Sequence, residues 1–185
     1  MKIEQTNLNG CFIVHDTVFD DGRGYFFESF NKKRFSELTG LSAEFVQDNQ
    51  SRSLRGVLRG LHFQTGEFAQ AKLVRVIKGQ VLDVAVDVRK NSPTFGKHFS
   101  IELTEASGTQ LYIPRGFAHG FVVLSEEAVF FYKCDNYYNK ASEAGISYCD
   151  PDLGIDWKLK AEKILLSEKD KNNPFLKDIQ PTLNF

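Results

Sequence analysis

Cysteine is scarce in this chain. Of 185 residues only Cys11, Cys134 and Cys149 carry a thiol, and no two of them form a CxxC pair. An odd, scattered set excludes a disulfide framework and a cysteine-based zinc site. Reduced thiols are typical of a reducing compartment, so the sequence predicts a cytoplasmic protein.

Long apolar runs and an excess of one charge are also missing. No apolar run approaches the roughly 18 residues that a membrane-spanning helix needs. The opening residues, MKIEQTNLNG, lack the apolar segment of a secretory signal. The 23 Lys and Arg nearly balance the 24 Asp and Glu, for a formal net charge of −1. We therefore expect no membrane partner and no nucleic-acid polymer, since such binders normally carry a basic excess.

Aromatic residues are abundant, and they favour β-structure. Phe alone, at 17, outnumbers Gly at 14, and aromatic and β-branched residues are enriched in strands. The length suits one domain with a sizeable core. We expect a single domain over residues 1–185, with a barrel over about 45–155 and a C-terminal tail over 156–185.

The chain reads as a series of short strands separated by Gly, Pro and Asn. Residues 81–88 alternate with a period of two, and Lys78-Gly79-Gln80 before them predicts a tight hairpin. One helix is expected over 31–39, with Asn31 as N-cap and Gly40 just past its end, and sequence after Trp157 leans towards helix. Strands are expected at 11–18, 25–30, 72–77, 81–88, 99–103, 110–113, 120–123 and 128–134. This pattern predicts a mainly β sandwich or small barrel.

Two glycine–histidine motifs specify the barrel further. Residues 108–119 fit G-x5-P-x-G-x2-H, which resembles the second cupin motif, and 56–62 fit the G-x5-H that opens the first. A metal-binding cupin continues H-x-H and then a Glu. Here Gln64 stands in place of the second His, and the Glu position falls on Phe68 or Ala69. Two imidazoles without a third strong ligand make a poor metal site, so we expect a cupin-type double-stranded β-helix (jelly-roll barrel) with no metal.

Eleven blocks together resemble one family, the dTDP-4-dehydrorhamnose 3,5-epimerases. In chain order they are DGRGYFFESF (21–30), FVQDNQS (45–51), GVLRGLHFQ (56–64), KLVRV (72–76), DVAVDVR (83–89), SPTFG (92–96), IPRGFAHGF (113–121), YKC (132–134), YY (137–138), DPDLGI (150–155) and LSEKD (166–170). Each block alone is weak, and their joint order and spacing is specific. The chain departs from the common family pattern at Gln50, Phe63 and Cys134.

The resemblance implies an isomerase that inverts C3 and C5 of dTDP-4-dehydro-6-deoxy-glucose, without a cofactor. Both carbons lie α to the C4 ketone, so a base, an enolate stabiliser and an acid on the opposite face suffice. By resemblance His62 is the base, with Asp170 paired to it. Lys72 would place positive charge at the enolate oxygen, and Tyr132 would be the general acid.

The resemblance also implies a nucleotide site. The cations Arg23, Arg59 and Lys169 correspond to phosphate ligands of the family, since Arg can grip phosphate oxygens bidentately. The other implied substrate contacts are Phe26, Glu28, Gln47, Asn49, His119, Tyr138 and Glu143. Residues near the N-terminus reach the neighbouring subunit's site in this family, which implies a homodimer.

Three other functions fit parts of the same pattern. An epimerase that inverts only one carbon would have the same residue types. A metal-dependent cupin would need ligands that Gln64 and Phe68 do not supply. A non-catalytic sugar-binding cupin would have no use for the acid, base and lysine. His15 and His98 lie outside the motifs and are expected to be surface or structural.

Overall fold

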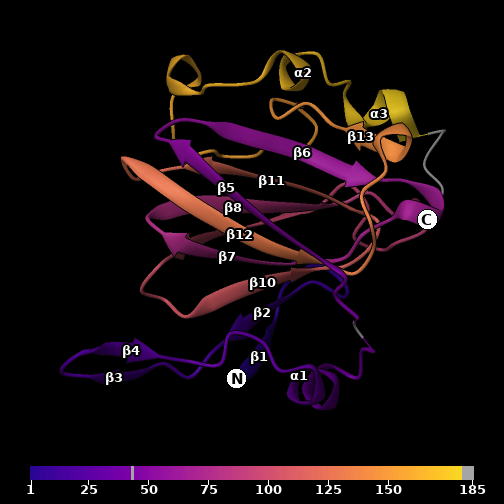
Figure 1. Ribbon diagram of the computed structural model, residues 1–185. Helices are drawn as coiled ribbons and strands as arrows, with labels where there is room; N and C mark the ends of the chain where they lie inside the picture. Colours follow the sequence, from indigo (N-terminus) through magenta and orange to yellow (C-terminus); the bar gives the residue numbers. More distant parts are fainter. Residues whose placement is uncertain (43, 181–185) are drawn as a thin grey trace.

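The computed structural model describes residues 1–42 and 44–180, and two antiparallel sheets facing each other dominate it (Figure 1). The six-stranded sheet has the order β1 (Lys2–Gln5), β2 (Phe12–His15), β10 (Thr109–Ile113), β7 (Lys72–Lys78), β12 (Glu127–Cys134) and β5 (Gln47–Leu54). The five-stranded sheet has the order β13 (Glu143–Gly145), β6 (Leu58–Gln64), β11 (Phe117–Val123), β8 (Gln80–Asp87) and β9 (His98–Thr104). The mainly β prediction is confirmed.

A small hairpin and short helices complete the described chain. The hairpin pairs β3 (Phe19–Asp21) with β4 (Gly24–Phe26) and projects away from the two sheets (Figure 1). The α-helices are α1 (Lys32–Thr39), α2 (Glu168–Lys171) and α3 (Leu176–Ile179), and single 3-10 turns occupy Gly66–Phe68, Lys140–Ser142 and Ala161–Lys163. None of the described helices is long and apolar enough to cross a membrane.

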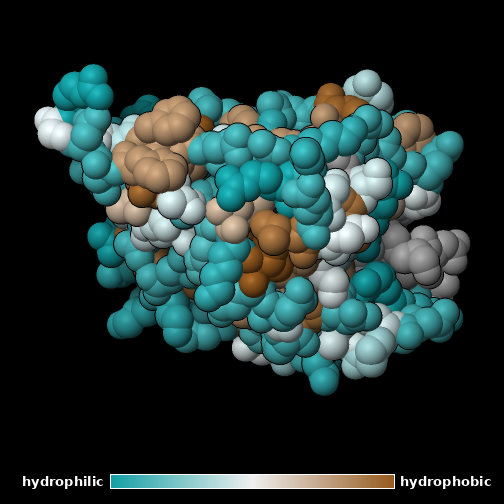
Figure 2. All heavy atoms as spheres, turned by 90° about the horizontal axis from the view of Figure 1, so that it is seen from below, coloured by the Kyte–Doolittle hydropathy of each residue, from teal (hydrophilic) through white to brown (hydrophobic). Residues whose placement is uncertain are grey.

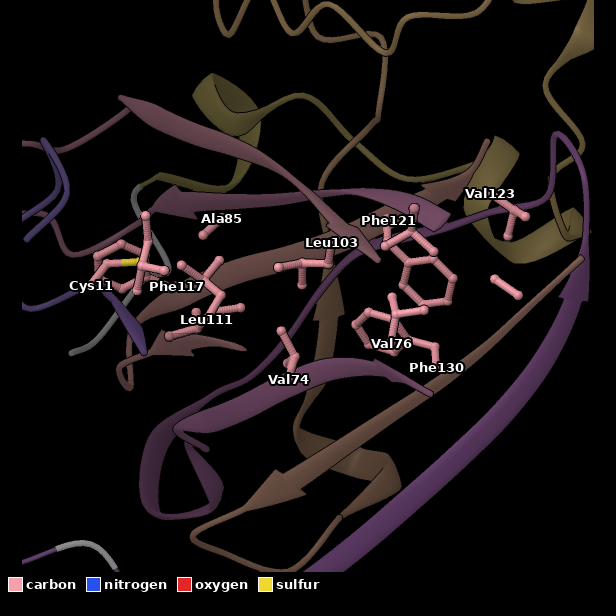
Figure 3. Packing of buried hydrophobic residues seen from close by; sticks show 14 of the residues in the cluster. Cys11, Val74, Val76, Ala85, Leu103, Leu111, Phe117, Phe121, Val123 and Phe130 are labelled. Atoms are coloured by element: carbon pink, nitrogen blue, oxygen red, sulfur yellow. The ribbon is translucent and has the colours of Figure 1, made fainter. Parts of the chain in front are cut away.

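The main core fills the space between the sheets (Figure 3). Val74 and Phe130 from the six-stranded sheet meet Phe121 and Ala85 from the five-stranded sheet, and the rings of Phe121 and Phe130 stack at 4.1 Å. This close packing accounts for part of the aromatic content, because large rings fill the interior between two sheets.

The C-terminal segment covers the outer face of the five-stranded sheet. Leu82, Val84 and Val86, the second alternating set of β8, form a separate buried cluster with Trp157 and Leu176. Strand β8 is therefore buried on both faces. This explains why its residues are all apolar except Gln80, Asp83 and Asp87. This covering segment leads directly to α2, which carries Asp170.

Helix α1 packs on the outer face of the other sheet. Its Phe35 is fully buried against Phe12 of β2 and Tyr112 of β10. Asn31 accepts a hydrogen bond from the Arg34 N–H as N-cap, and Gly40 is left-handed at φ 72°. Both expected helix boundaries are confirmed.

The predicted hairpin at Gly79 is wrong. Strands β7 and β8 belong to different sheets, so the turn carries the chain from one sheet to the other. Gly79 has φ 81°, and a Cβ there would lie 2.1 Å from the Glu127 carbonyl, so the corner requires glycine. Local turn signals predict a reversal of the chain, and only the pairing partners decide whether the two strands share a sheet.

Most predicted strands are present with shifted ends, and five of the described strands were not predicted. The strand expected at 11–18 is Phe12–His15, and the one at 25–30 is reduced to Gly24–Phe26. The unpredicted strands are β1, β3, β5, β6 and β13. Strand β5 reads QDNQSRSL, with no apolar alternation, because its inward residues line a polar cavity. Strands β1 and β2 join the six-stranded sheet, although they precede residue 45, where the barrel was expected to begin.

Candidate active site

A cavity of about 610 Å³ lies between the two sheets. The five-stranded sheet contributes Arg59, His62 and His119, and the six-stranded sheet contributes Asn49, Lys72 and Tyr132. The C-terminal segment from Leu165 to Asp170 closes one side. A smaller cavity of about 240 Å³ is lined by several of the same residues and also by Gln47, Gln64 and Tyr138. The volume of the larger cavity falls within the usual range for small-molecule sites.

His62 and Asp170 form a pair across 108 positions of sequence. The His62 Nε2 lies 2.5 Å from Asp170 Oδ1, and Asp170 is only 3% exposed. Burial acts to raise the pKa of Asp170, but the hydrogen bond and charge of His62 outweigh it, so the pKa lies below its ordinary value. The carboxylate is an acceptor, so Nε2 carries the proton and donates it. In the neutral tautomer this leaves the lone pair on His62 Nδ1, the atom that a general base would use.

The cap of helix α2 and the segment before it set the position of Asp170. Ser167 is the N-cap of α2, and its hydroxyl accepts a hydrogen bond from the Asp170 N–H at 3.1 Å. The Leu58 N–H bonds to the Leu165 carbonyl, which ties the segment before α2 to β6, the strand of His62. The pairing therefore depends on the C-terminal segment docking along β6.

A second histidine–aspartate pair lies beside the first. His119 is the cross-strand neighbour of His62, and its Nε2 is 2.8 Å from Asp83 Oδ2. Burial lowers the pKa of His119, and the Asp83 charge only partly opposes this, so the imidazole is neutral near pH 7. Strands β6 and β11 approach each other closely here. Glycine at position 60 allows this approach, since a Cβ on Gly60 would lie 2.5 Å from the Gly120 Cα.

Lys72 and Tyr132 face these histidines from the opposite sheet. Their strands β7 and β12 are paired, and the Lys72 Nζ lies 5.8 Å from the centre of the Tyr132 ring. Burial lowers the pKa of Lys72 below 10.5 and raises that of Tyr132 to about 12. Tyr132 therefore stays protonated over the working pH range and is available as a proton donor.

Polar residues around the cavity are held in a network. Arg59 Nε donates to the buried Ser53 hydroxyl at 3.0 Å. Glu143 Oε2 accepts from the Tyr138 hydroxyl at 3.0 Å and pairs with Lys169 Nζ at 2.5 Å. Burial acts to raise the pKa of Glu143, but these two partners lower it overall. The predicted contacts Tyr138, Glu143 and Lys169 thus lie together in the structure.

Three predicted contacts lie away from these cavities. Arg23 and Phe26 belong to the β3–β4 hairpin, where Phe26 is 72% exposed and Arg23 pairs only with Asp21 among the described residues. Glu28 follows the hairpin and accepts from the Asn31 amide at 3.0 Å. None of the three lines a described cavity that contains His62. One chain alone brings together the other eleven predicted site residues and leaves these three apart.

Sequence reasoning missed Asp83, Ser53 and Ser167. Asp83 occupies an inward position of an alternating apolar strand, and a buried carboxylate needs a partner, so its placement was a detectable signal. Ser53 and Ser167 gave no such signal, because serines at strand ends and helix caps are common. Over residues 1–42 and 44–180, no group of three or more His, Cys, Asp and Glu side chains is arranged to hold a metal ion.

Comparison with known proteins gives a consistent family. The family model described as dTDP-4-dehydrorhamnose 3,5-epimerase matches residues 5–178. A curated dTDP-4-dehydrorhamnose 3,5-epimerase from Shigella flexneri is 51% identical over 172 residues, covering 93% of this chain and 94% of the relative.

Solved structures agree with the sequence match and confirm the cupin-like barrel. The crystal structure of dTDP-4-dehydrorhamnose 3,5-epimerase from Elizabethkingia anophelis superposes with a TM-score of 0.93 at 59% identity, covering 96% of this chain and 97% of that one. The dTDP-6-deoxy-D-glucose-3,5-epimerase from Legionella pneumophila, solved with dTDP-4-keto-L-rhamnose, gives 0.92 at 49% identity, covering 95% and 93%. The opposed histidine and tyrosine, the family model and these structures together show that the chain belongs to the dTDP-4-dehydrorhamnose 3,5-epimerase family.

Proposed function

We propose that this chain converts dTDP-4-dehydro-6-deoxy-glucose to dTDP-4-dehydro-L-rhamnose by inverting C3 and C5. The observation that carries the proposal is the placement of His62 and Tyr132 on facing sheets of one cavity. A sugar ring bound between the sheets has one face towards a base and the other towards an acid. Inversion at a carbon needs this opposed arrangement, since the proton must leave one face and arrive at the other.

Each inversion is a balanced exchange of protons. His62 Nδ1 takes the proton from a carbon next to the C4 ketone, and the electron pair moves to the ketone oxygen as an enolate. The Lys72 ammonium stabilises that oxygen. Tyr132 then gives its hydroxyl proton to the opposite face of the same carbon, which restores the ketone and leaves a tyrosinate. Asp170 holds His62 in the reactive tautomer and stabilises its protonated form.

Two inversions require the acid and base to be reset between them. After the first, His62 holds an extra proton and Tyr132 lacks one. The cavity is open to solvent at its mouth, so we infer that water performs the exchange. We infer that His119, which is neutral and held by Asp83, is a polar contact for the sugar next to His62.

The remaining polar side chains suit a nucleoside diphosphate. Arg59 and Lys169 supply positive charge to the cavity wall, and Asn49 supplies an amide from β5 of the six-stranded sheet. Tyr138 offers an exposed ring for stacking on a base. Gln47 lies next to Tyr138 and is hydrogen-bonded to both Tyr138 and Asn49.

The active assembly in this proposal is a homodimer. Phe19, Tyr25 and Phe26 expose large rings on a projecting hairpin, and Figure 2 shows apolar side chains gathered beside that projection. Exposed apolar patches of this kind mark protein contacts. We infer that the hairpin of each subunit carries Arg23, Phe26 and Glu28 to the partner's cavity.

Subunit mixing tests the dimer directly. Arg23→Ala and His62→Asn each inactivate their own homodimer, but a reassorted mixed dimer regains one intact site if the hairpin is exchanged. About a quarter of wild-type activity is expected after statistical reassortment. Failure to recover activity in a mixture shown to contain mixed dimers would contradict hairpin exchange.

The free thiols Cys11, Cys134 and Cys149 support a reducing, cytoplasmic location for this enzyme.

Deuterium incorporation tests the reaction. Each inversion delivers one proton from the exchangeable Tyr132 hydroxyl, so turnover in D₂O adds one deuterium at C3 and one at C5. Mass spectrometry of the recovered sugar counts them. Two labels support double inversion, one label supports the single-carbon epimerase, and none with folded protein would overturn the proposal.

A further inference from the structure

The loop between β12 and β13 carries Tyr138 and is anchored at several points. We define this strap as residues 135–142. Its start is held by the Asp135 N–H on the Ala71 carbonyl at 3.1 Å, and its end by the Thr65 N–H on the Ser142 carbonyl at 2.8 Å. Between these ends the strap crosses beside the smaller cavity, where Tyr138 forms part of the wall.

Two glutamines hold the middle of the strap through consecutive backbone amides. Gln47 Oε1 accepts the Tyr138 N–H at 3.0 Å, and Gln64 Oε1 accepts the Asn139 N–H at 2.8 Å. Gln47 belongs to β5 and Gln64 to β6, so one anchor comes from each sheet. Together they fix the backbone on both sides of the Tyr138 carbonyl.

Gln64 is the residue that stands in place of a metal ligand in the cupin-like motif. It is only 5% exposed and lies two residues after His62 on β6, next to Glu143 across the strand pair. A buried amide without a partner is unfavourable, and its carbonyl oxygen is used on the strap. The amide therefore has a task of its own, distinct from the acid–base chemistry.

We propose that Gln64 is a positioning residue that holds the strap so that the Tyr138 ring meets the nucleotide base. The inference rests on the proposed function, because it takes the ligand to be a dTDP-sugar. Without the Gln64 acceptor, the Asn139 N–H loses its partner, while Tyr138 keeps the Gln47 contact to its N–H and the Glu143 contact to its hydroxyl. The backbone that follows the Tyr138 ring then has to be ordered when the nucleotide binds, which weakens binding.

The effect separates binding from chemistry. His62, Asp170, Lys72 and Tyr132 make no hydrogen bond to Gln64 that the structure describes, so proton transfer is left intact. We expect Gln64→Leu to raise KM for the dTDP-sugar, and Kd for dTDP alone, by about tenfold. We expect kcat to change by no more than about twofold.

A double-mutant cycle tests whether Gln64 acts through Tyr138. If it does, Gln64→Leu combined with Tyr138→Ala binds dTDP no more weakly than Tyr138→Ala alone. Additive losses in calorimetric titrations would overturn the inference. Gln80→Leu is the matched control, since it removes the same amide from a surface contact with Glu102. Its Kd for dTDP should equal that of the wild type.

Hydrogen exchange reads out the strap itself. In the folded Gln64→Leu protein, the Asn139 amide should exchange faster than in the wild type, while amides of β11 stay protected. Thermal melting establishes that the variant is folded. Wild-type protein that fails to bind dTDP would defeat the proposed function. Wild-type binding with unchanged binding by Gln64→Leu would defeat only the positioning role.

Discussion

Replacing Asp170 by Asn should cripple the reaction while leaving nucleotide binding intact. Asp170 is buried and its only side-chain partner among the described groups is His62, at 2.5 Å. A hydrogen bond to a charged group contributes about 1.5–3 kcal/mol, and more of it is expressed in the transition state as His62 gains a proton. At about 1.36 kcal/mol per tenfold, kcat should fall about 10- to 150-fold.

The assay is the rate of deuterium incorporation at C3 and C5 under saturating substrate, together with calorimetric titration of dTDP. The matched control is Asp156→Asn, which removes the same charge from an exposed position paired with Lys158. The control should retain wild-type rates. A kcat for Asp170→Asn within about twofold of wild type would refute the assignment of Asp170 as the partner of the base.

The same substitution has a consequence for stability. The pKa of Asp170 is lower in the folded chain than its ordinary 3.8, so the ionised carboxylate stabilises the fold above that pH. This contribution disappears as the pH falls through the folded value. The difference in unfolding free energy between wild type and Asp170→Asn should therefore shrink below about pH 4. A difference that is constant between pH 7 and pH 3 would contradict the shifted pKa.

Three further outcomes are expected. Tyr132→Phe removes the proposed acid, so inversion should slow by about 10²- to 10⁴-fold, whereas loss of activity with equal loss of dTDP binding would point to a structural role. Because burial lowers the pKa of Lys72, its charge is lost as pH rises at a lower pH than for ordinary lysine, so kcat should decline with a midpoint below 10.5; a rate that holds to higher pH would contradict this. Tyr132, with a pKa of about 12, stays protonated throughout this range. Gly60→Ala should lower the melting temperature markedly, since its Cβ would lie 2.5 Å from the Gly120 Cα, and an unchanged melting curve would show that β6 and β11 can separate.

Local signals in the sequence predicted individual elements well where short-range periodicity or capping residues decided them. Strand β8 and helix α1 follow directly from a period of two and from Asn31 and Gly40 as caps. The strand prediction failed where inward side chains line the cavity instead of packing in the core. Strand β5 is polar along its inward face because it lines the site, so it lacks the expected alternation.

The hairpin at Gly79 shows a different limit. A Gly between two apolar runs indicates a tight turn, and the turn is present. Whether its flanking strands pair with each other depends on strands distant in the chain, since β7 pairs with β10 and β12 while β8 pairs with β9 and β11. Non-local pairing of this kind leaves no local signal.

The sequence by itself determined the chemistry available to this protein: its fold class, its family and the residue types for acid, base and enolate charge. The resemblance to the family is enough to predict catalytic roles for His62, Lys72, Tyr132 and Asp170 without any geometry. Only the tertiary structure decided their relative placement. It set the proposed base, His62, and the proposed acid, Tyr132, on opposite sheets, buried Asp170 against His62, and gave His119 its partner Asp83. These relations join residues far apart in sequence, and they exist only after both sheets and the C-terminal segment have packed.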